Sequence, residues 1–269
     1  MGIIQRQGIK HSIVNFTGLV IGTASTLFVY TQQEVVEAYG LVQYLLAIGI
    51  VGFPLFSFAG NTVAIRYFPS FQNKASGHHG FLVLLVLMVL TAWSVCAVLA
   101  AVVWGTIQPM LAGDSVLLRQ YLWMAFPLAL FYALAVILSQ YAFNFKRIVI
   151  PSIIIDFSLK LFLPAQMVAL WLGWISLDLA LWLLLGHYFL MAAAMVIYLR
   201  QLGEWHWRPD WSFLTPVLRS NMIRYAAFGV ATSFAILIVT KVDTLMVGTL
   251  TSVKNTAIYA IALNIAAAI

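Results

Sequence analysis

The sequence predicts an all-α membrane protein, a polytopic bundle of about eight transmembrane helices, from three observations. Of its 269 residues, 63% are hydrophobic and 8% are charged, whereas soluble domains carry about 25% charged residues. Asp, Glu, Lys and Arg are absent from long intervals, each able to supply the roughly 20 apolar residues of a spanning helix. These intervals are bounded by Lys10 and Glu34, Glu37 and Arg66, Lys74 and Asp114, Arg119 and Lys146, and Asp178 and Arg200. The short polar gaps between them carry positive charge on alternate sides, which is typical of a multi-pass membrane protein.

The expected spans cover residues 12–30, 39–65, 80–105, 121–144, 148–172, 178–199, 223–243 and 255 to the end. The first is about 19 residues long, longer than the roughly 7–15 apolar residues of a cleaved signal peptide, so we expect it to be retained. Gly18 and Gly22 in this span have the spacing that permits close helix packing. Pro54 and Pro164 predict kinks in the second and fifth spans.

A polar connection separates the first six spans from the last two. It contains Trp205, Trp207 and Trp211. Because Trp favours the membrane–water interface, we expect an amphipathic linker that lies on the membrane surface. The expected organisation is a six-helix lobe at 1–200, an interfacial linker at 201–222, and the first two helices of a second lobe at 223–269.

The last two spans resemble the opening of the chain. A shift of 220 residues aligns Thr31 with Thr251, Tyr39 with Tyr259, Leu41 with Ile261 and Ala47 with Ala267. In both places a span, a short polar turn and a second span beginning at Tyr follow one another. We therefore expect two related halves of six helices. The second would be incomplete, because the chain stops at Ile269 inside a hydrophobic segment, as an N-terminal portion of a longer protein would.

The distribution of Lys and Arg predicts the orientation. Ten of these residues fall in gaps on one side: Arg6, Lys10, Arg66, Lys74, Lys146, Arg147, Arg200, Arg208, Arg219 and Arg224. Three fall on the other side, namely Arg119, Lys241 and Lys254, and Lys160 lies inside a span. Cytoplasmic loops of membrane proteins are enriched in Lys and Arg. The side with ten cations, and with it the N-terminus, is therefore expected in the cytoplasm.

Several short motifs resemble a known family. They are Arg6-Gln7-Gly8-Ile9-Lys10-His11-Ser12, Glu37-Ala38-Tyr39-Gly40-Leu41, Arg66-Tyr67-Phe68-Pro69, Lys241-Val242-Asp243-Thr244-Leu245-Met246-Val247-Gly248 and Ile258-Tyr259. With the hydropathy pattern, they resemble bacterial polysaccharide biosynthesis proteins, the O-antigen and capsule flippases of the multidrug/oligosaccharidyl-lipid/polysaccharide exporter superfamily. The resemblance implies a MATE-like architecture of two lobes around a central cavity. It also implies alternating access in the bacterial cytoplasmic membrane, with a lipid-linked oligosaccharide as substrate. Membrane lipids and other polysaccharide assembly proteins are the further partners it implies.

Asp156 and Lys160 are the clearest chemical anomaly. At 1.5 Å per residue they lie about 12 Å and 18 Å into the fifth span. A charged side chain at mid-membrane costs about 2.5–3.5 kcal/mol on insertion scales, so the pair requires an explanation. Their i,i+4 spacing, with the acid first, puts both on one face of a helix. Three interpretations stay open: an internal ion pair that orients the helix, a Lys160 that faces an aqueous cavity and meets a pyrophosphate, or a position nearer the interface.

Arg66 and Arg224 are candidate ligands for a lipid diphosphate at the cytoplasmic mouths of two spans. A planar guanidinium suits bidentate contact with phosphate, although cations at helix ends also simply follow the positive-inside rule. Arg6 and Lys10 are candidates for attracting anionic head groups to the leaflet. Asp243 follows Lys241 by two residues, so the two do not share a helix face. The resemblance makes Asp243 part of a recurrent motif, with capping, cation coupling and gating as open roles.

The sequence gives no support for disulfide, metal-binding or enzymatic chemistry. Cys96 is the single cysteine, which excludes an internal disulfide and a cysteine-based metal cage. His78 and His79 are adjacent in a Gly-rich turn, and adjacent histidines do not converge on a metal as i,i+4 histidines do. The sequence contains no Gly-rich phosphate loop, Ser–His–Asp set or acidic pair at catalytic spacing. We expect no enzyme activity, no cofactor, no metal and no nucleic-acid partner.

The sequence favours one of three functions. The leading one is a flippase for polyisoprenyl-diphosphate-linked oligosaccharide in surface polysaccharide biosynthesis. A multidrug or cation antiporter of the same fold would place a carboxylate in its first bundle; the first span has none, but Asp156 keeps this alternative open. An integral-membrane glycosyltransferase or polymerase would need large external loops, and the external gaps here are short.

Overall fold

The computed structural model describes residues 3–266, and within this range the chain is helical and has no strand, which confirms the all-α class. The helices are α1 (Ile3–Phe28), α2 (Gln33–Phe56), α3 (Gly60–Phe71), α4 (Phe81–Val102), α5 (Trp104–Ala112), α6 (Val116–Tyr121), α7 (Ala125–Phe143), α8 (Val149–Ser152), α9 (Ser158–Trp171), α10 (Leu177–Gln201), α11 (Pro216–Leu250) and α12 (Val253–Ala266). Shorter turns are the 3-10 segments Gly77–Gly80 and Leu122–Met124 and the π-helical segment Ile153–Phe157.

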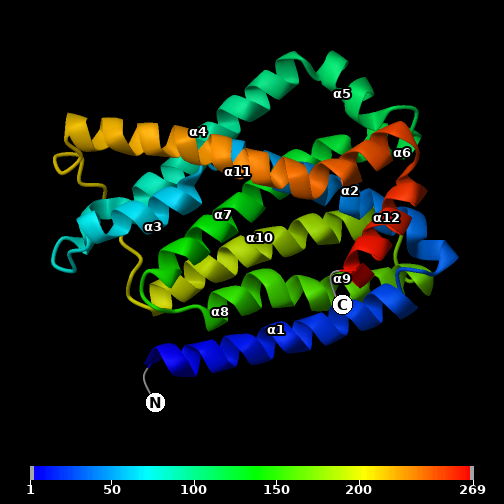
Figure 1. The fold of residues 1–269 in the computed structure, drawn as a ribbon, viewed down its shortest axis with the longest axis horizontal. Coiled ribbons are helices and arrows are strands. Elements are labelled where there is room, and N and C mark those ends of the chain that lie inside the picture. The colour runs from blue at the N-terminus through cyan, green and yellow to red at the C-terminus, as the bar shows by residue number, and fades with distance from the viewer. Residues whose placement is uncertain (1–2, 267–269) are drawn as a thin grey trace.

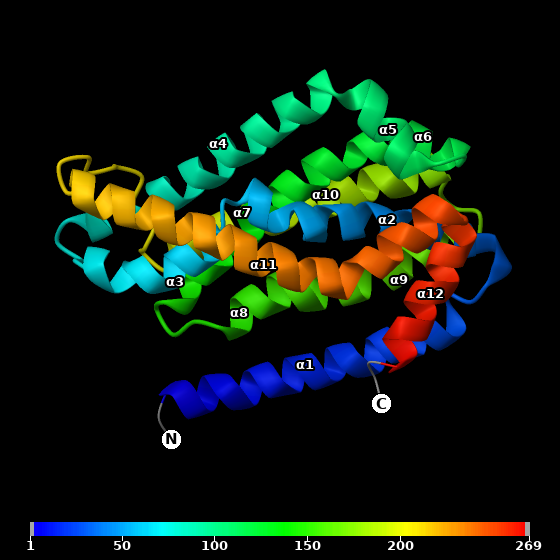
Figure 2. The same ribbon diagram turned by 45° about the horizontal axis from the view of Figure 1, so that its top comes forward.

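The long helices lie side by side along the long axis of the molecule, as helices that cross one layer do (Figure 1). At the centre, α2 packs against α7, α9, α11 and α12, and its Tyr39, Leu41 and Leu45 are completely buried. At one edge of the bundle, α1 packs against α8 and α9 (Figure 2). On another side, α4 leaves the bundle, and α5 turns back toward α6 (Figures 1 and 2).

Six helical segments in the described range are long and apolar enough to cross a membrane. They are Gln33–Phe71, Gly77–Val102, Val116–Phe143, Val149–Trp171, Leu177–Gln201 and Pro216–Leu250. These six correspond to the second through seventh predicted spans, and the predicted count of about eight is not confirmed. The first predicted span falls in α1, a continuous helix of 26 residues whose apolar sequence is interrupted by His11, Asn15 and Thr17. The last predicted span falls in α12, a 14-residue helix. Ala267 of the internal alignment and the predicted incomplete end lie outside the described residues.

Both prolines for which a kink is predicted lie inside helices. In the second span the helix continues through Pro54, and the break follows at Phe58 and Ala59, which adopt positive φ angles of 47° and 49°. In the fifth span the chain stays helical through Pro164, and the irregular part is the preceding π-helical segment. A proline disturbs the turn that precedes it, because its ring crowds the carbonyl four residues earlier and it has no N–H to donate. The kink predicted at Pro164 stays a prediction.

The linker is shorter than predicted because α11 begins at Pro216 rather than at 223. Thr215 caps this helix, its hydroxyl accepting a hydrogen bond from the Leu218 N–H at 3.3 Å, and Pro216 occupies the first helical position. With 35 residues, α11 is about 50 Å long, longer than the roughly 30 Å hydrocarbon layer. Its first turns therefore extend past the apolar layer.

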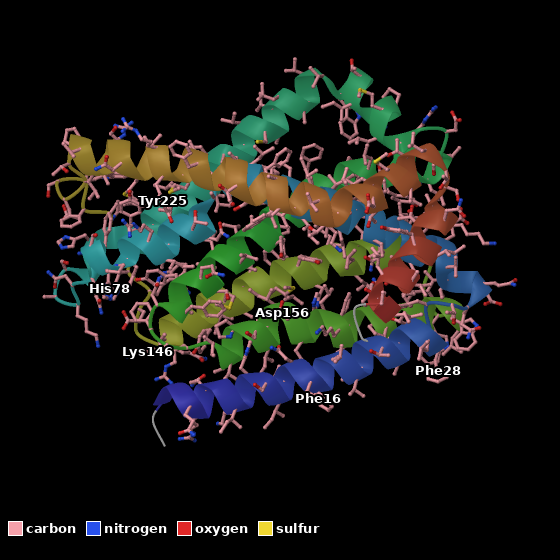
Figure 3. The ribbon with its side chains drawn as sticks, in the orientation of Figure 1. Phe16, Phe28, His78, Lys146, Asp156 and Tyr225 are labelled. Atoms are coloured by element: carbon pink, nitrogen blue, oxygen red, sulfur yellow. The ribbon has the colours of Figure 1, made fainter. Side chains whose placement is uncertain are left out.

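Charge is distributed unequally between the two ends of the bundle. The N-terminal end of α1, the segments 72–80 and 144–148, the linker 202–215 and the start of α11 gather at one end, which carries Lys146 (Figures 1 and 3). We call it the basic end, because the ten Lys and Arg residues assigned to one side belong to these segments and the helix turns beside them. The segments 29–32, 103–115, 172–176 and 251–252 lie at the opposite end. That the basic end faces the cytoplasm stays a prediction.

Candidate functional site

Two cavities contain Arg66, Arg224 and Lys160, the three candidate diphosphate ligands. The first, the inner cavity, lies between α1, α2, α9 and α12, encloses about 220 Å³ and contains Lys160. Its other polar lining residues are Thr23, Thr26, Tyr30, Tyr39, Gln43 and Asn264. Polar side chains inside a membrane span are costly and mark functional sites. The inner cavity is therefore a candidate for contact with a polar substrate.

A glycine on α1 gives Lys160 its place in the inner cavity. A Cβ added at Gly18 would lie 2.9 Å from Lys160 Cδ and 3.3 Å from its Nζ, so the lysine side chain crosses directly over Gly18. At Gly22 no atom lies within 4 Å of an added Cβ. The Gly18/Gly22 pair thus makes room for the Lys160 side chain and for the cavity. It does not bring two helix backbones close together, as the sequence predicted.

Aromatic and amide groups form the wall of the inner cavity nearest the end opposite the basic end. The rings of Tyr30 and Tyr39 stack with centroids 4.0 Å apart. Asn264 Nδ2 donates a hydrogen bond to the Tyr39 hydroxyl at 3.0 Å, which joins α12 to α2. Gln43 and Asn264 are not among the predicted site residues. Their signal was an amide side chain within an otherwise apolar segment.

Asp156 and Lys160 do not form the internal ion pair that was one of the three open interpretations. Among the described residues, no contact of 4.0 Å or less joins an Asp156 carboxylate oxygen to Lys160 Nζ. Asp156 is exposed and lies in the π-helical segment Ile153–Phe157, midway along the bundle (Figure 3). Asp156 lies near the end of the π-helical segment and Lys160 in the first turn of α9, and their charged groups stay apart. Asp156 remains within electrostatic reach of Lys160 and of His11 on α1.

The second cavity, the arginine cleft, brings Arg66 and Arg224 together at the basic end. It lies between α3 and α11 and encloses about 670 Å³. The other residues that line it are Tyr67, Pro69, Ser70, Asn221, Tyr225 and Phe228. The arginines come from sequence segments that are far apart, and both are exposed. None of the described lining residues is acidic, so the two guanidinium groups present a surface of one charge.

Helix periodicity and a close helix contact shape the arginine cleft. Asn221, Arg224, Tyr225 and Phe228 recur at i, i+3, i+4 and i+7 and therefore share one face of α11. The rings of Tyr67 and Tyr225 meet edge to face with centroids 5.8 Å apart (Tyr225 is labelled in Figure 3). Farther along, a Cβ added at Gly229 would lie 2.8 Å from Thr62 Oγ1, so α11 and α3 approach closely there. This approach limits the depth of the cleft.

The remaining predicted site residues line neither cavity. Arg6 and Lys10 are exposed on the first turns of α1, at the basic end. Asp243 is also exposed, and its carboxylate accepts a hydrogen bond from the Tyr259 hydroxyl at 3.2 Å. This contact ties α11 to α12, so it gives Asp243 a bridging position between two helices.

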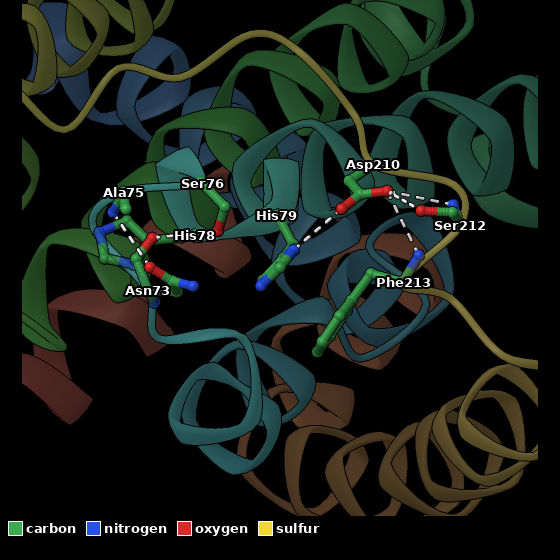
Figure 4. Close-up of polar contacts among 8 residues, drawn as sticks. All are labelled: Asn73, Ala75, Ser76, His78, His79, Asp210, Ser212 and Phe213. Atoms are coloured by element: carbon green, nitrogen blue, oxygen red, sulfur yellow. Dashed lines mark hydrogen bonds and ion pairs between the residues drawn. The ribbon is translucent and has the colours of Figure 1, made fainter.

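His78 and His79 join the segment 72–80 to the linker. Buried His78 accepts the Asn73 N–H at Nδ1 (3.2 Å), so its Nε2 carries the proton and donates to Glu204 at 3.0 Å. The His79 ring nitrogen Nδ1 lies 2.9 Å from Asp210 Oδ2 (Figure 4), and the His79 ring stacks on Phe213. We call the contacts His78–Glu204 and His79–Asp210 the histidine clamp. The adjacent pair holds the linker in place, and no metal cluster of His, Cys, Asp and Glu occurs in the described range.

Hydrogen bonds keep Asp210 in the clamp ionised. Its carboxylate accepts hydrogen bonds from the Ser212 hydroxyl, from His79 and from the Phe213 N–H, and these lower its pKa from the usual 3.8 to about 2. At the turn itself, Gly77 and Gly80 have positive φ, and a Cβ at Gly80 would lie 2.4 Å from the Arg208 carbonyl oxygen. Glycine at 80 therefore lets the two backbones meet.

Comparison of the chain with known protein families, with curated proteins and with solved structures gives no match.

Proposed function

We propose that the protein is a flippase that moves a polyisoprenyl-diphosphate-linked oligosaccharide across the bacterial cytoplasmic membrane for surface polysaccharide synthesis. Transport of this kind makes and breaks no covalent bond, so the residues act by binding and by lowering the cost of carrying charge. The proposal includes a two-lobed, MATE-like assembly, in which 1–200 and 223–269 belong to different lobes.

The observation that carries the proposal is the arginine cleft. Arg66 and Arg224 line one cavity at the basic end and face no lining carboxylate there. Arginine binds phosphate bidentately, and two arginines match the two phosphates of a diphosphate. Ser70, Asn221 and the tyrosines of the cleft offer hydrogen bonds and ring faces to the first sugar.

Lys160 supports a path beyond the cleft. Within the described range this lysine has no ion-pair partner, and it lies in a cavity whose wall also holds Gln43 and Asn264. A cation in a polar intramembrane cavity lowers the cost of passing an anionic group through the apolar layer. In the proposed cycle the diphosphate binds first at the arginine cleft and later near Lys160.

Binding by the purified protein in detergent tests the proposal. Replacing Arg66 or Arg224 with Gln removes a charge-assisted hydrogen bond and is expected to weaken binding of a polyisoprenyl-diphosphate oligosaccharide about tenfold. Arg208→Gln is the matched control, because Arg208 is exposed in the linker and lines neither cavity. Unchanged affinity in both cleft variants would contradict the proposal. In cells, the same two variants are expected to reduce surface polysaccharide at unchanged protein abundance.

A cation antiporter is the second candidate, and Asp156 is the observation that favours it. Asp156 is an exposed residue within a predicted span, and its carboxylate pairs with no cation at 4.0 Å or less in the described range. Such a group could bind an organic cation or a coupling ion. Binding of tetraphenylphosphonium that is lost in Asp156→Asn, together with no binding of the diphosphate lipid, would decide for the antiporter.

A further inference from the structure

A third cavity, the apolar groove, lies beside the start of α11 and on the opposite side from the arginine cleft. It lies between α4, the first turns of α11 and the linker, and encloses about 430 Å³. Leu84, Leu87 and Met88 of α4 form one wall, and Arg219 and Ile223 of α11 contribute to the other. Trp211 closes the linker side. The groove shares no lining residue with either cavity of the proposed transport path.

The groove combines an apolar slot with one cation. Arg219 is the charged residue among those that line it, and no described lining residue is acidic. The side chain of Arg219 is exposed, and it also borders a neighbouring hollow of about 550 Å³ that Arg224 and Ser220 line. An apolar slot with a guanidinium at its rim is complementary to a molecule that has a hydrocarbon chain and a phosphate at one end.

The place of the groove in the bundle identifies the source of such a molecule. The groove opens at the basic end, next to Trp211, which is 58% exposed, and Trp favours the membrane–water interface. From the groove toward the opposite end, α4 continues with exposed apolar side chains at Leu90, Val95 and Val98. An acyl chain that leaves the slot would therefore stay on an apolar surface and remain in the bilayer.

We propose that the apolar groove binds an anionic phospholipid of the leaflet at the basic end, with one acyl chain in the slot and the phosphate on Arg219. The bound lipid contacts α4, α11 and the linker together. It thus fastens the start of α11, which carries Arg219 and Arg224, to the first six helices. The inference does not depend on transport, because membrane phospholipid is present whatever the substrate is.

Native mass spectrometry of the purified protein, with phosphatidylglycerol and phosphatidylcholine as competing probes, tests the inference. The wild type is expected to prefer phosphatidylglycerol about fivefold, the effect of a single basic residue at an anionic surface. Arg219→Gln is expected to lose this preference, Arg219→Lys to retain most of it, and Arg208→Gln to keep it. Leu87→Trp, which fills the slot, is expected to weaken the binding of both lipids.

Three outcomes would overturn the inference. The first is an equal preference in the wild type and in Arg219→Gln. The second is full displacement of phosphatidylglycerol by inorganic phosphate, which would reduce the site to an anion contact without an acyl chain. The third is displacement by a polyisoprenyl-diphosphate lipid at a lower concentration than phosphatidylglycerol itself, which would assign the groove to a transport substrate. Loss of oligosaccharide binding in Arg66→Gln bears only on the proposed function, so the two proposals can fail separately.

Discussion

Lys160 owes its position to the absence of a side chain at Gly18. The lysine crosses α1 where a Cβ would lie 2.9 Å from its Cδ atom. A neighbour of this kind is a flexible chain that can move, so a substitution at Gly18 is expected to shift Lys160 within the inner cavity rather than to separate the helices.

A pair of alanine variants isolates this contact. Gly22→Ala meets no atom within 4 Å and is expected to stabilise α1 by about 0.5–1 kcal/mol, because alanine favours the helix over glycine. Gly18→Ala makes the same change in helix propensity but also crowds Lys160, so we expect it to gain less stability or to lose some. Unfolding in detergent measures both free energies. An equal gain in the two variants would mean that Lys160 does not rest on Gly18.

The carboxyl group of Asp210 gives the histidine clamp a defined pH dependence. Its pKa is about 2 in the structure and 3.8 ordinarily, so the folded state favours the ionised carboxylate. The stability that it contributes is therefore complete above about pH 4 and is lost as the pH falls from there to about 2. Ser212 is the largest cause of the low pKa.

The predicted variant is accordingly Ser212→Ala, which should raise the pKa of Asp210 toward 3.8. A carbon NMR titration of the Asp210 carboxyl group in detergent measures this value. Ser76→Ala is the control, since the Ser76 hydroxyl donates to the Asn73 carbonyl and does not touch Asp210 (Figure 4). A pKa near 3.8 in the wild type itself would show that the clamp does not form in solution.

At the scale of the element, the start of α11 decides whether the arginine cleft exists. Thr215 caps the helix, and Arg219 and Arg224 lie in the turns that follow. Removing a Thr cap costs about 1 kcal/mol of helix stability. We expect Thr215→Ala to increase hydrogen exchange of the amides at 217–220 and to weaken diphosphate binding at the cleft.

Thr232→Ala is the matched control for this variant. Thr232 lies within α11, and its hydroxyl donates to the Phe228 carbonyl, so it removes a hydroxyl from the same helix without removing a cap. Faster exchange at 217–220 in both variants would show a general loosening of α11 rather than the loss of a cap.

The elements also mark what the sequence could supply. Spans two through seven were predictable because an apolar run is a local property, visible without any packing partner. The start of α11 at Thr215-Pro216 was also predictable, because Thr followed by Pro is a local signal for the start of a helix. The predicted start at residue 223 missed it. The π-helical segment that holds Asp156 was not predictable, because no residue pattern announces it.

The same distinction holds for the candidate sites. Arg66 and Arg224 were chosen individually for their place at the ends of spans, and their union in one cleft follows from the packing of α3 on α11. The histidine clamp was not predicted at all, since it joins two loops far apart in the sequence. Single candidate residues could be chosen from the sequence. Contacts between residues far apart in the sequence could be found only in the tertiary structure.

For the whole molecule, the decisive property is which end faces the cytoplasm. The ten cations of the basic end predict that this end, with the segment 72–80 and the linker, is cytoplasmic. The proposed diphosphate site depends on it, because that site must meet a lipid-linked precursor at the inner leaflet. The phospholipid groove does not, because it takes its lipid from whichever leaflet lies at the basic end. The exposed residues Ser76, at the basic end, and Thr31, at the opposite end, offer positions for a direct test.

In a Cys96→Ala background, a single cysteine at Thr31 or Ser76 reports the orientation. Cys96 is the single native cysteine, so the background removes all other labelling. In intact cells a membrane-impermeant maleimide is expected to label Thr31→Cys and to leave Ser76→Cys unmodified, and permeabilised cells should show labelling of both. The permeabilised sample is the control for thiol reactivity. Labelling of Ser76→Cys alone in intact cells would show that the protein has the opposite orientation. The arginine cleft would then open to the exterior, where no cytoplasmic lipid-linked precursor could reach it.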